Sequence, residues 1–147
     1  MIKLELSIHG AHLTLSIINL SAREVRLWEW ENSWGWFSVA IQVRDKTGKQ
    51  VEIRRKIHEW TKNGPVYFTL RQQERREVLI DLHDGWWEVE GSSAGELASW
   101  QDQPLELRAR LQIDPTPESE RFDVFTGVVF SDWISSRPPH RWLPAIE

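Results

Sequence analysis

The 147-residue chain contains no cysteine. It therefore has no disulfide framework, no thiolate zinc site, no iron–sulfur cluster and no cysteine nucleophile. The absence also fits a reducing compartment, where disulfides are rare. We expect a fold held together by its hydrophobic core, and a function without redox chemistry.

Long apolar runs and long basic runs are missing as well. No apolar stretch approaches the ~20 residues that a membrane-spanning helix needs. Residues 1–8 alternate apolar and polar side chains, unlike a secretory signal, so we expect a cytoplasmic protein. The formal net charge is −4, and glutamates interrupt the basic residues at 54–56 and 71–76. Neither nucleic acid nor a membrane is an expected partner.

Motifs that carry catalysis or hold a cofactor are also lacking. The sequence has no glycine-rich phosphate loop, no serine nucleophile elbow and no dinucleotide fingerprint. Its five histidines do not have the spacing of a helical zinc motif. His83 and Asp84 are neighbours, but adjacent side chains of an extended chain point to opposite faces. We predict no catalytic residues, no cofactor and no bound metal.

What the chain has in abundance is strict alternation of apolar and polar residues. Residues 2–8 put four aliphatic side chains on one face of a strand. Turn signals recur about every eight to twelve residues, as in antiparallel sandwiches. Similar runs occur near 13–17, 25–27, 37–43, 51–57, 66–70, 78–82, 105–113 and 122–130. We predict an all-β chain that forms a single antiparallel β-sandwich of about nine strands.

The length suits one domain. We place the sandwich in residues 1–134 and an irregular, proline-rich tail in residues 135–147, because its three prolines remove amide donors. Residues 92–100 can form one or two helical turns. Residues 114–120, DPTPESE, are predicted to be a polar loop.

Two segments resemble a known group of proteins. The short linker Asn19-Leu20-Ser21 within LTLSIINLSAREVRLW, and the segment YFTLRQQERREVLIDL, resemble small immunoglobulin-like β-sandwich proteins of the bacterial intracellular inhibitor and immunity type. In that group a proline-glycine-glutamate turn joins two such strands, and here Gln72-Gln73-Glu74 stands in its place. The resemblance covers about the first ninety residues and implies an immunoglobulin-like fold. It carries over no inhibitory loop.

Tryptophan is the most unusual feature, with ten residues, four of them in LWEWENSWGWF. If Leu27 faces the core, alternation turns Trp28 and Trp30 outward. If Phe37 begins the core face of the next strand, Trp36 also faces outward. A neighbouring strand, the 92–100 segment or the tail can instead cover Trp28 and Trp36, and both readings stay open. Trp100, Trp133 and Trp142 are expected in the core or against the tail.

The remaining tryptophans fall in predicted loops with acidic neighbours. Tryptophan is over-represented among the residues that dominate protein interfaces, and loops at one end of a sandwich can converge. Acidic groups around such a surface suit a partner with a basic cleft. The candidate contact residues are Trp28, Trp30, Trp34, Trp36, Trp60, Trp86, Trp87, Glu29, Glu31, Glu59, Asp84 and Glu88.

The leading hypothesis is a non-catalytic protein-binding domain, in its most concrete form an immunity protein that occludes the active site of a bacterial toxin. One alternative is a carbohydrate-binding module whose tryptophans stack on sugar rings, although export would then be expected. Another is an enzyme with dispersed residues, for which a deep pocket uniting His58, His83 and a carboxylate would be the first sign. Glu29 and Glu31 could serve as a glycosidase pair only if another segment supplied the geometry.

Overall fold

A computed structural model describes residues 1–60, 63–90 and 97–144, and the chain is all-β, as predicted. The short helical elements include η1 (Ser99–Asp102) and α2 (Pro117–Arg121). The strands are β1 (Ile2–His9), β2 (His12–Asn19), β3 (Val25–Trp28), β4 (Val39–Asp45), β5 (Gln50–Arg55), β6 (Tyr67–Leu70), β7 (Arg75–Ile80), β8 (Trp87–Glu90), β9 (Leu105–Ile113), β10 (Gly127–Phe130) and β11 (Ile134–Ser136).

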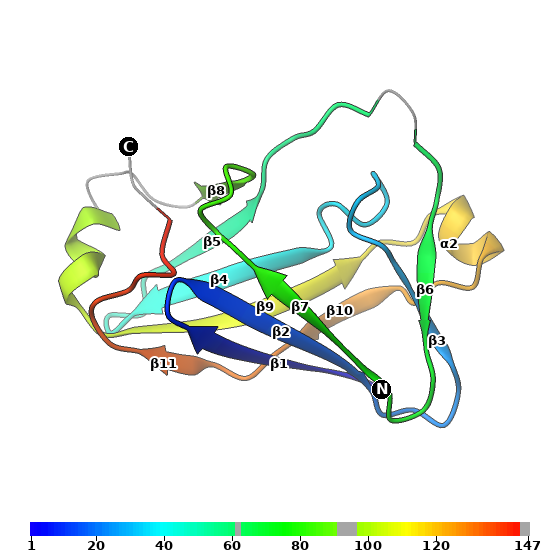
Figure 1. The fold of residues 1–147 in the computed structure, drawn as a ribbon, viewed down its shortest axis with the longest axis horizontal. Coiled ribbons are helices and arrows are strands. Elements are labelled where there is room, and N and C mark those ends of the chain that lie inside the picture. Colours follow the sequence, from blue (N-terminus) through cyan, green and yellow to red (C-terminus); the bar gives the residue numbers. More distant parts are fainter. Residues whose placement is uncertain (61–62, 91–96, 145–147) are drawn as a thin grey trace.

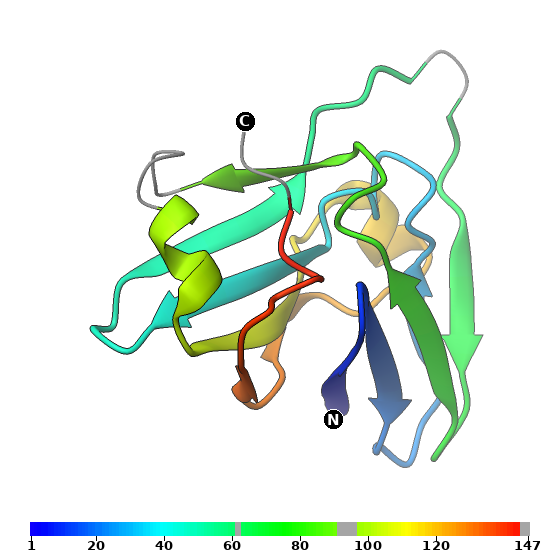
Figure 2. The ribbon, with the colours of Figure 1, turned by 60° about the vertical axis from the view of Figure 1, so that its left-hand side comes forward.

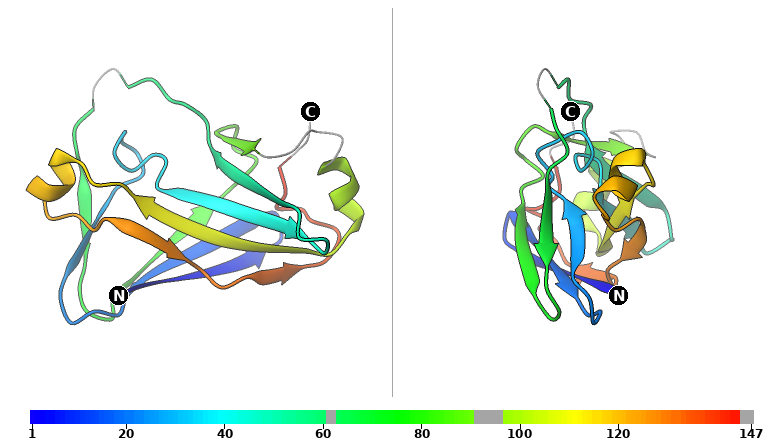
Figure 3. Two further views of the ribbon diagram at one scale, coloured as in Figure 1. Left: turned by 180° about the vertical axis from the view of Figure 1, so that it is seen from behind. Right: turned by 90° about the vertical axis from the view of Figure 1, so that its right-hand side faces the viewer.

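The strands form two main layers and a separate ribbon (Figures 1 and 2). One layer has the strand order β1-β2-β7, and the other has the order β10-β9-β4-β5-β8, with β11 also paired to β9. All of these pairs are antiparallel. Seen from behind, the larger sheet faces the viewer (Figure 3). Strand β1 contacts β10 and β11, so the two layers meet along one side.

The core lies between the layers and follows the alternation in the sequence. In β9, every odd-numbered residue from Leu105 to Ile113 is buried, and the residues between them are half-buried. In β1, the apolar residues Ile2, Leu4 and Leu6 are buried, and their polar neighbours are exposed. Period-two burial of this kind is what a strand with one covered face requires.

The ribbon pairs β3 with β6, and Leu27 and Trp28 at the end of β3 are both buried. Alternation puts Leu27 and Trp28 on opposite faces of β3, yet both belong to the hydrophobic core. Trp28 is only 1% exposed, because Trp34 of the loop after β3 and Phe122, the residue after α2, pack against it. The prediction of a polar loop at 114–120 is wrong in part, because Pro117–Arg121 form the short helix α2. Thr116 caps α2 in a capping box with Ser119, and Pro117 is the first helical residue.

The strand pattern is wrong at two further places. β4 begins at Val39, so Phe37 lies in the preceding turn and is 48% exposed instead of facing the core. The last strand, β10, begins at Gly127, later than the predicted start near residue 122. The eleven strands of the described residues also exceed the predicted nine, since the pattern missed β8 and β11.

The C-terminal segment packs into the molecule. β11 crosses the predicted boundary at residue 134, and residues 137–144 contain no helix or strand. Trp142 is buried, and its indole Nε1 donates a hydrogen bond to Ser136 Oγ at 2.9 Å. Ser136 Oγ lies 2.7 Å from Nδ1 of buried His140. The tail therefore supplies part of the core.

Among the described residues, the helices are all too short to span a bilayer.

Candidate functional site

The loop between β3 and β4, residues 29–38, contributes residues to two neighbouring surfaces, which are described in turn below. Buried Asn32 holds its shape: Asn32 Oδ1 accepts hydrogen bonds from the backbone N–H groups of Trp34 and Gly35, at 3.0 and 3.1 Å, and Asn32 Nδ2 donates to the Val66 carbonyl at 3.1 Å. At Gly35 there is no room for a side chain, since a Cβ would overlap the Glu29 carbonyl oxygen. The loop is thus rigidly placed, and its two flanks present different surfaces.

On one flank, Trp36, His58, Trp60 and Trp86 form an aromatic cluster, called here the aromatic cap. The His58 ring lies among the three indoles, with centroid distances of 4.3 Å to Trp60, 5.0 Å to Trp86 and 5.1 Å to Trp36. Trp36 meets Trp60 and Trp86 edge to face, at 5.6 and 5.5 Å. Edge-to-face pairs are favourable arrangements of aromatic rings, so the cap is packed within itself.

Trp36 forms the base of the cap, and Trp86 is its open end. Trp36 is 4% exposed, and its indole Nε1 donates to the Lys56 carbonyl at 2.7 Å. Trp86 is 43% exposed, and its backbone N–H donates to Asp84 Oδ1 at 2.8 Å. Trp60 is half-buried. The cap therefore offers two partly accessible indoles on a fixed base.

The Arg55 guanidinium lies beside the base of the cap. Its Cζ is 4.0 Å from the centroid of Trp36, 5.3 Å from Trp87 and 5.9 Å from Trp30. Desolvation lowers the pKa of Arg55, against the opposing charges of Glu31 and Asp84. Cation–π contacts of a desolvated guanidinium are the stronger kind, so Arg55 ties three tryptophans together.

The predicted acidic residues divide into two groups. Glu31 is exposed and lies 3.7 Å from Arg55 Nη1, Asp84 is exposed beside Trp86, and Glu59 is exposed between His58 and Trp60. These three border the cap. Glu29 makes two hydrogen bonds of 2.9 Å with Arg76, and Glu88 lies 3.9 Å from Arg54, so both are matched by cations.

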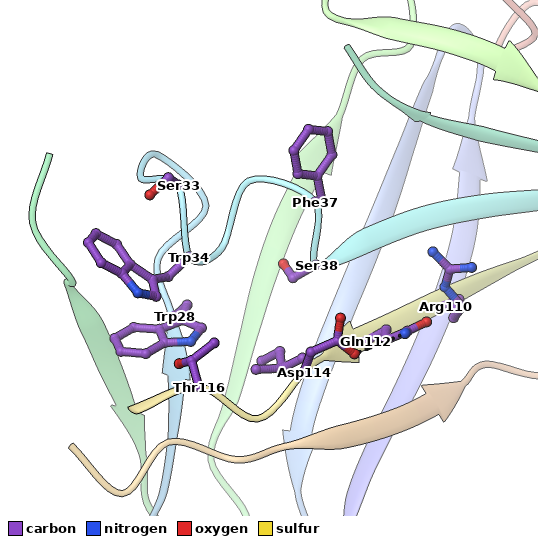
Figure 4. A pocket seen from close by; sticks show the side chains of 10 residues that line it. Trp28, Ser33, Trp34, Phe37, Ser38, Arg110, Gln112, Asp114 and Thr116 are labelled. Atoms are coloured by element: carbon purple, nitrogen blue, oxygen red, sulfur yellow. Dashed lines mark hydrogen bonds between the residues drawn. The ribbon is translucent and has the colours of Figure 1, made fainter. Parts of the chain in front are cut away.

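On the other flank, the loop borders a groove of about 550 Å³. We call it the polar groove; Figure 4 shows Trp34 over Trp28 at one side, Arg110 at the other, and Gln112 and Asp114 between them. Its lining residues are Trp28, Ser33, Trp34, Phe37, Ser38, Arg110, Gln112, Ile113, Asp114 and Thr116. The indoles of Trp28 and Trp34 are 6.2 Å apart between centroids, and this contact fixes Trp34.

The polar groups of this groove come mainly from the outer face of β9 and the residue after it. Arg110 Nη1 donates to Glu52 Oε2 at 2.8 Å, and Arg110 Nε has no hydrogen-bond partner among the described residues. Gln112 Nε2 donates to Asp114 Oδ1 at 3.1 Å. One cation and one carboxylate thus line the groove, each with a polar neighbour.

Three candidate contact residues are buried: for Trp28 and Trp36 this is one of the two readings left open, and for Trp87 it differs from the predicted loop position. Trp28 and Trp36 are sealed, and Trp87 is 7% exposed because it begins β8 instead of lying in a loop. They are not available as contacts on the folded chain. Trp30, Trp34 and Trp60 are half-buried, and Trp86 is exposed. The rings packed against Trp28 are Trp34 and Phe122, and those packed against Trp36 are His58, Trp60 and Trp86.

Sequence reasoning missed several residues that build these surfaces. His58 and Arg55 were not expected to touch the tryptophans, since they follow β4 by a whole strand. The row Arg110, Gln112 and Asp114 was visible as the polar half of an alternating strand. Nothing in the local pattern, however, shows that Trp34 and Phe37 would lie opposite that row.

His58 and His83, the two histidines considered for catalysis, contact different groups. His58 lies within the aromatic cap, and His83 Nε2 lies 2.8 Å from the Arg141 carbonyl. Within residues 1–60, 63–90 and 97–144, no three His, Asp or Glu side chains are grouped so as to hold a metal ion. The arrangement at the loop is suited to binding, through rings, carboxylates and amides on a rigid frame.

A scan against models of protein families, a search of curated proteins and a search of solved structures each found no match to this chain.

Proposed function

We propose that this chain is a non-catalytic protein-binding domain whose contact surface is the aromatic cap with Glu31, Glu59 and Asp84. The observation that carries the proposal is Trp86, a 43% exposed indole held in place by ring contacts to Trp36 and His58. A large aromatic residue that is already ordered loses little conformational entropy on binding. Tryptophan is also the residue type most enriched among interface hot spots.

The charge around the cap selects the kind of partner. Glu59 and Asp84 are exposed, and Glu31 is 79% exposed at its side chain with its cation, Arg55, largely buried behind it. Carboxylates at the rim of an interface steer association toward a basic surface. The most concrete form of the proposal is an immunity protein that covers the basic active-site cleft of a bacterial toxin.

The strand order supports an immunoglobulin-like architecture, which we include in the proposal. In the immunoglobulin fold, strands A, B and E share one sheet, and strands G, F, C and C′ share the other. The orders β1-β2-β7 and β10-β9-β4-β5 correspond to these two rows. Such a scaffold brings loops together at its ends, where binding residues collect.

Affinity capture followed by measurement on the purified partner tests the proposal. We expect the wild-type chain to retain a basic protein whose own expression arrests growth, with relief when this chain is co-expressed. Trp86→Ala should weaken that complex by about thirtyfold, typical of an interfacial tryptophan. Leu79→Ala is the matched control, since Leu79 is an exposed apolar residue of β7, outside the cap. Equal affinity for Trp86→Ala and wild type would refute the assignment.

A further inference from the structure

The polar groove has chemistry that the aromatic cap does not use. It is lined by two accessible aromatic side chains, Trp34 and Phe37, and by the polar side chains of Arg110, Gln112 and Asp114. Its volume of about 550 Å³ lies in the range of small-molecule sites. We propose that the polar groove binds a neutral sugar of one or two pyranose rings.

The aromatic side of the groove supplies stacking surface. Phe37 is 48% exposed, and Trp34 is half-buried against Trp28, so each keeps part of its ring open to the groove. The face of a pyranose that carries axial C–H groups is apolar and weakly positive, and it packs on the negative face of an aromatic ring. Trp34 needs no rearrangement for this, because Asn32 and Trp28 already hold it.

The polar side supplies matched hydrogen-bonding groups. Arg110, Gln112 and Asp114 are two residues apart along β9 and its extension, a spacing of about 7 Å in an extended chain. Guanidinium, amide and carboxylate groups are planar and can each bond to two neighbouring atoms at once. Adjacent hydroxyls of a sugar ring, each both donor and acceptor, match such groups.

The charge balance favours a neutral ligand. Arg110 is paired with Glu52, and Asp114 accepts from Gln112. A phosphate or carboxylate in the groove would meet Asp114, and an amine would meet Arg110. Neither class of ion finds an excess of opposite charge there, whereas hydroxyl groups can bond to both ends of the row.

Two-dimensional ¹H–¹⁵N NMR titration tests the proposal with defined probes: glucose, galactose, mannose, N-acetylglucosamine, maltose, cellobiose and lactose, with glucuronate and glucosamine as charged comparisons. We expect at least one neutral sugar to shift the Trp34 indole and Gln112 amide signals saturably at millimolar concentration. Asp114→Ala and Phe37→Ala, both at exposed positions, should each weaken that binding by about tenfold. Gln50→Ala, an exposed glutamine of β5, is the control and should change nothing.

The sugar site stands or falls separately from the protein contact. Trp86→Ala should leave sugar binding unchanged, because Trp86 does not line the groove. The inference is overturned if no neutral sugar produces saturable shifts, if a charged comparison binds as tightly as the best neutral sugar, or if Asp114→Ala and Phe37→Ala bind as wild type does. Loss of partner capture in Trp86→Ala alone would concern only the proposed function.

Discussion

The two flanks of the 29–38 loop use tryptophan in different ways. At the polar groove, Trp28 is sealed beneath Trp34 and Phe122, so its ring serves packing. At the aromatic cap, the sealed ring of Trp36 supports Trp86, which stays open. In each case a buried indole forms the base for a more accessible one. The two flanks differ in the side chains around these indoles. Polar side chains line the groove, whereas other aromatic rings and exposed carboxylates surround the indoles of the cap.

This comparison also separates stability from binding. Burial of an indole contributes to folding in proportion to the area removed from water, whereas an exposed indole contributes mainly when a partner covers it. Substitutions at the buried bases should therefore lower the free energy of unfolding strongly, and substitutions at the open rings should lower it little.

The largest effect is expected at the base of the groove flank. Trp28→Ala should lower the free energy of unfolding by about 3–5 kcal/mol, because it leaves a cavity between β3, the loop and α2. Urea denaturation followed by circular dichroism measures this. A loss below about 1 kcal/mol would mean that the α2 segment does not cover Trp28 in solution.

Gly35→Ala should disturb both flanks together. A Cβ at this position meets the Glu29 carbonyl and lies 2.9 Å from Trp28 Cβ, so the loop must move. We expect a loss of about 2–4 kcal/mol in unfolding free energy, with shifts in the NMR signals of both the Trp34 and Trp36 indoles. Gly64→Ala is the matched control, since nothing lies within 4 Å of a Cβ there. Equal stability of the two variants would contradict the tight approach at Gly35.

Trp86→Ala should have a small effect on stability and a large one on binding. Its ring is 43% exposed, so we expect the free energy of unfolding to fall by about 1 kcal/mol or less. Thermal unfolding measured beside Trp28→Ala tests the contrast directly. A destabilisation as large as that of Trp28→Ala would show that Trp86 belongs to the core and not to an open cap.

The smallest effect is expected at Asp45, the last residue of β4, at the end of the strand away from the 29–38 loop. Desolvation raises the pKa of Asp45, but hydrogen bonds from Thr47, Lys49 and Trp100 outweigh it, and the pKa is lowered. A carboxyl with a lowered folded-state pKa stabilises the fold above its unfolded-state pKa, and this contribution disappears as the pH falls through the folded-state value. The free energy of unfolding of the wild type should exceed that of Asp45→Asn most at neutral pH, and this difference should shrink in acid. A difference independent of pH would contradict the assignment.

The alternating strands were predictable because their burial is local. In β1 and β9, each apolar residue needs only the opposite layer to cover it, and a period of two reports that directly. The same reasoning put Trp28 on the face of β3 opposite Leu27 and expected it to point away from the core, but Trp28 is a buried member of the hydrophobic core. Alternation does not predict whether a distant segment covers that second face, and here Phe122 after α2 packs against it.

The candidate site was less predictable because it joins segments distant in sequence. Trp36, His58 and Trp86 come from three different loops, and their meeting depends on β5 pairing with β8. Phe37 was misassigned because an apolar residue one step before a strand extends the alternation without belonging to the strand. The tryptophans and acids of the cap were identified by composition, but their exposure was decided by the fold.

Hydroxyl-radical footprinting of the tryptophans, read by mass spectrometry with and without the captured partner, tests the central claim most directly. The account predicts rapid oxidation of Trp86 in the free protein, clear protection of Trp86 in the complex, and slow oxidation of Trp28 and Trp142 in both states. Slow oxidation of Trp86 in the free protein, or equal oxidation with and without the partner, would contradict an open aromatic cap that serves as the contact surface.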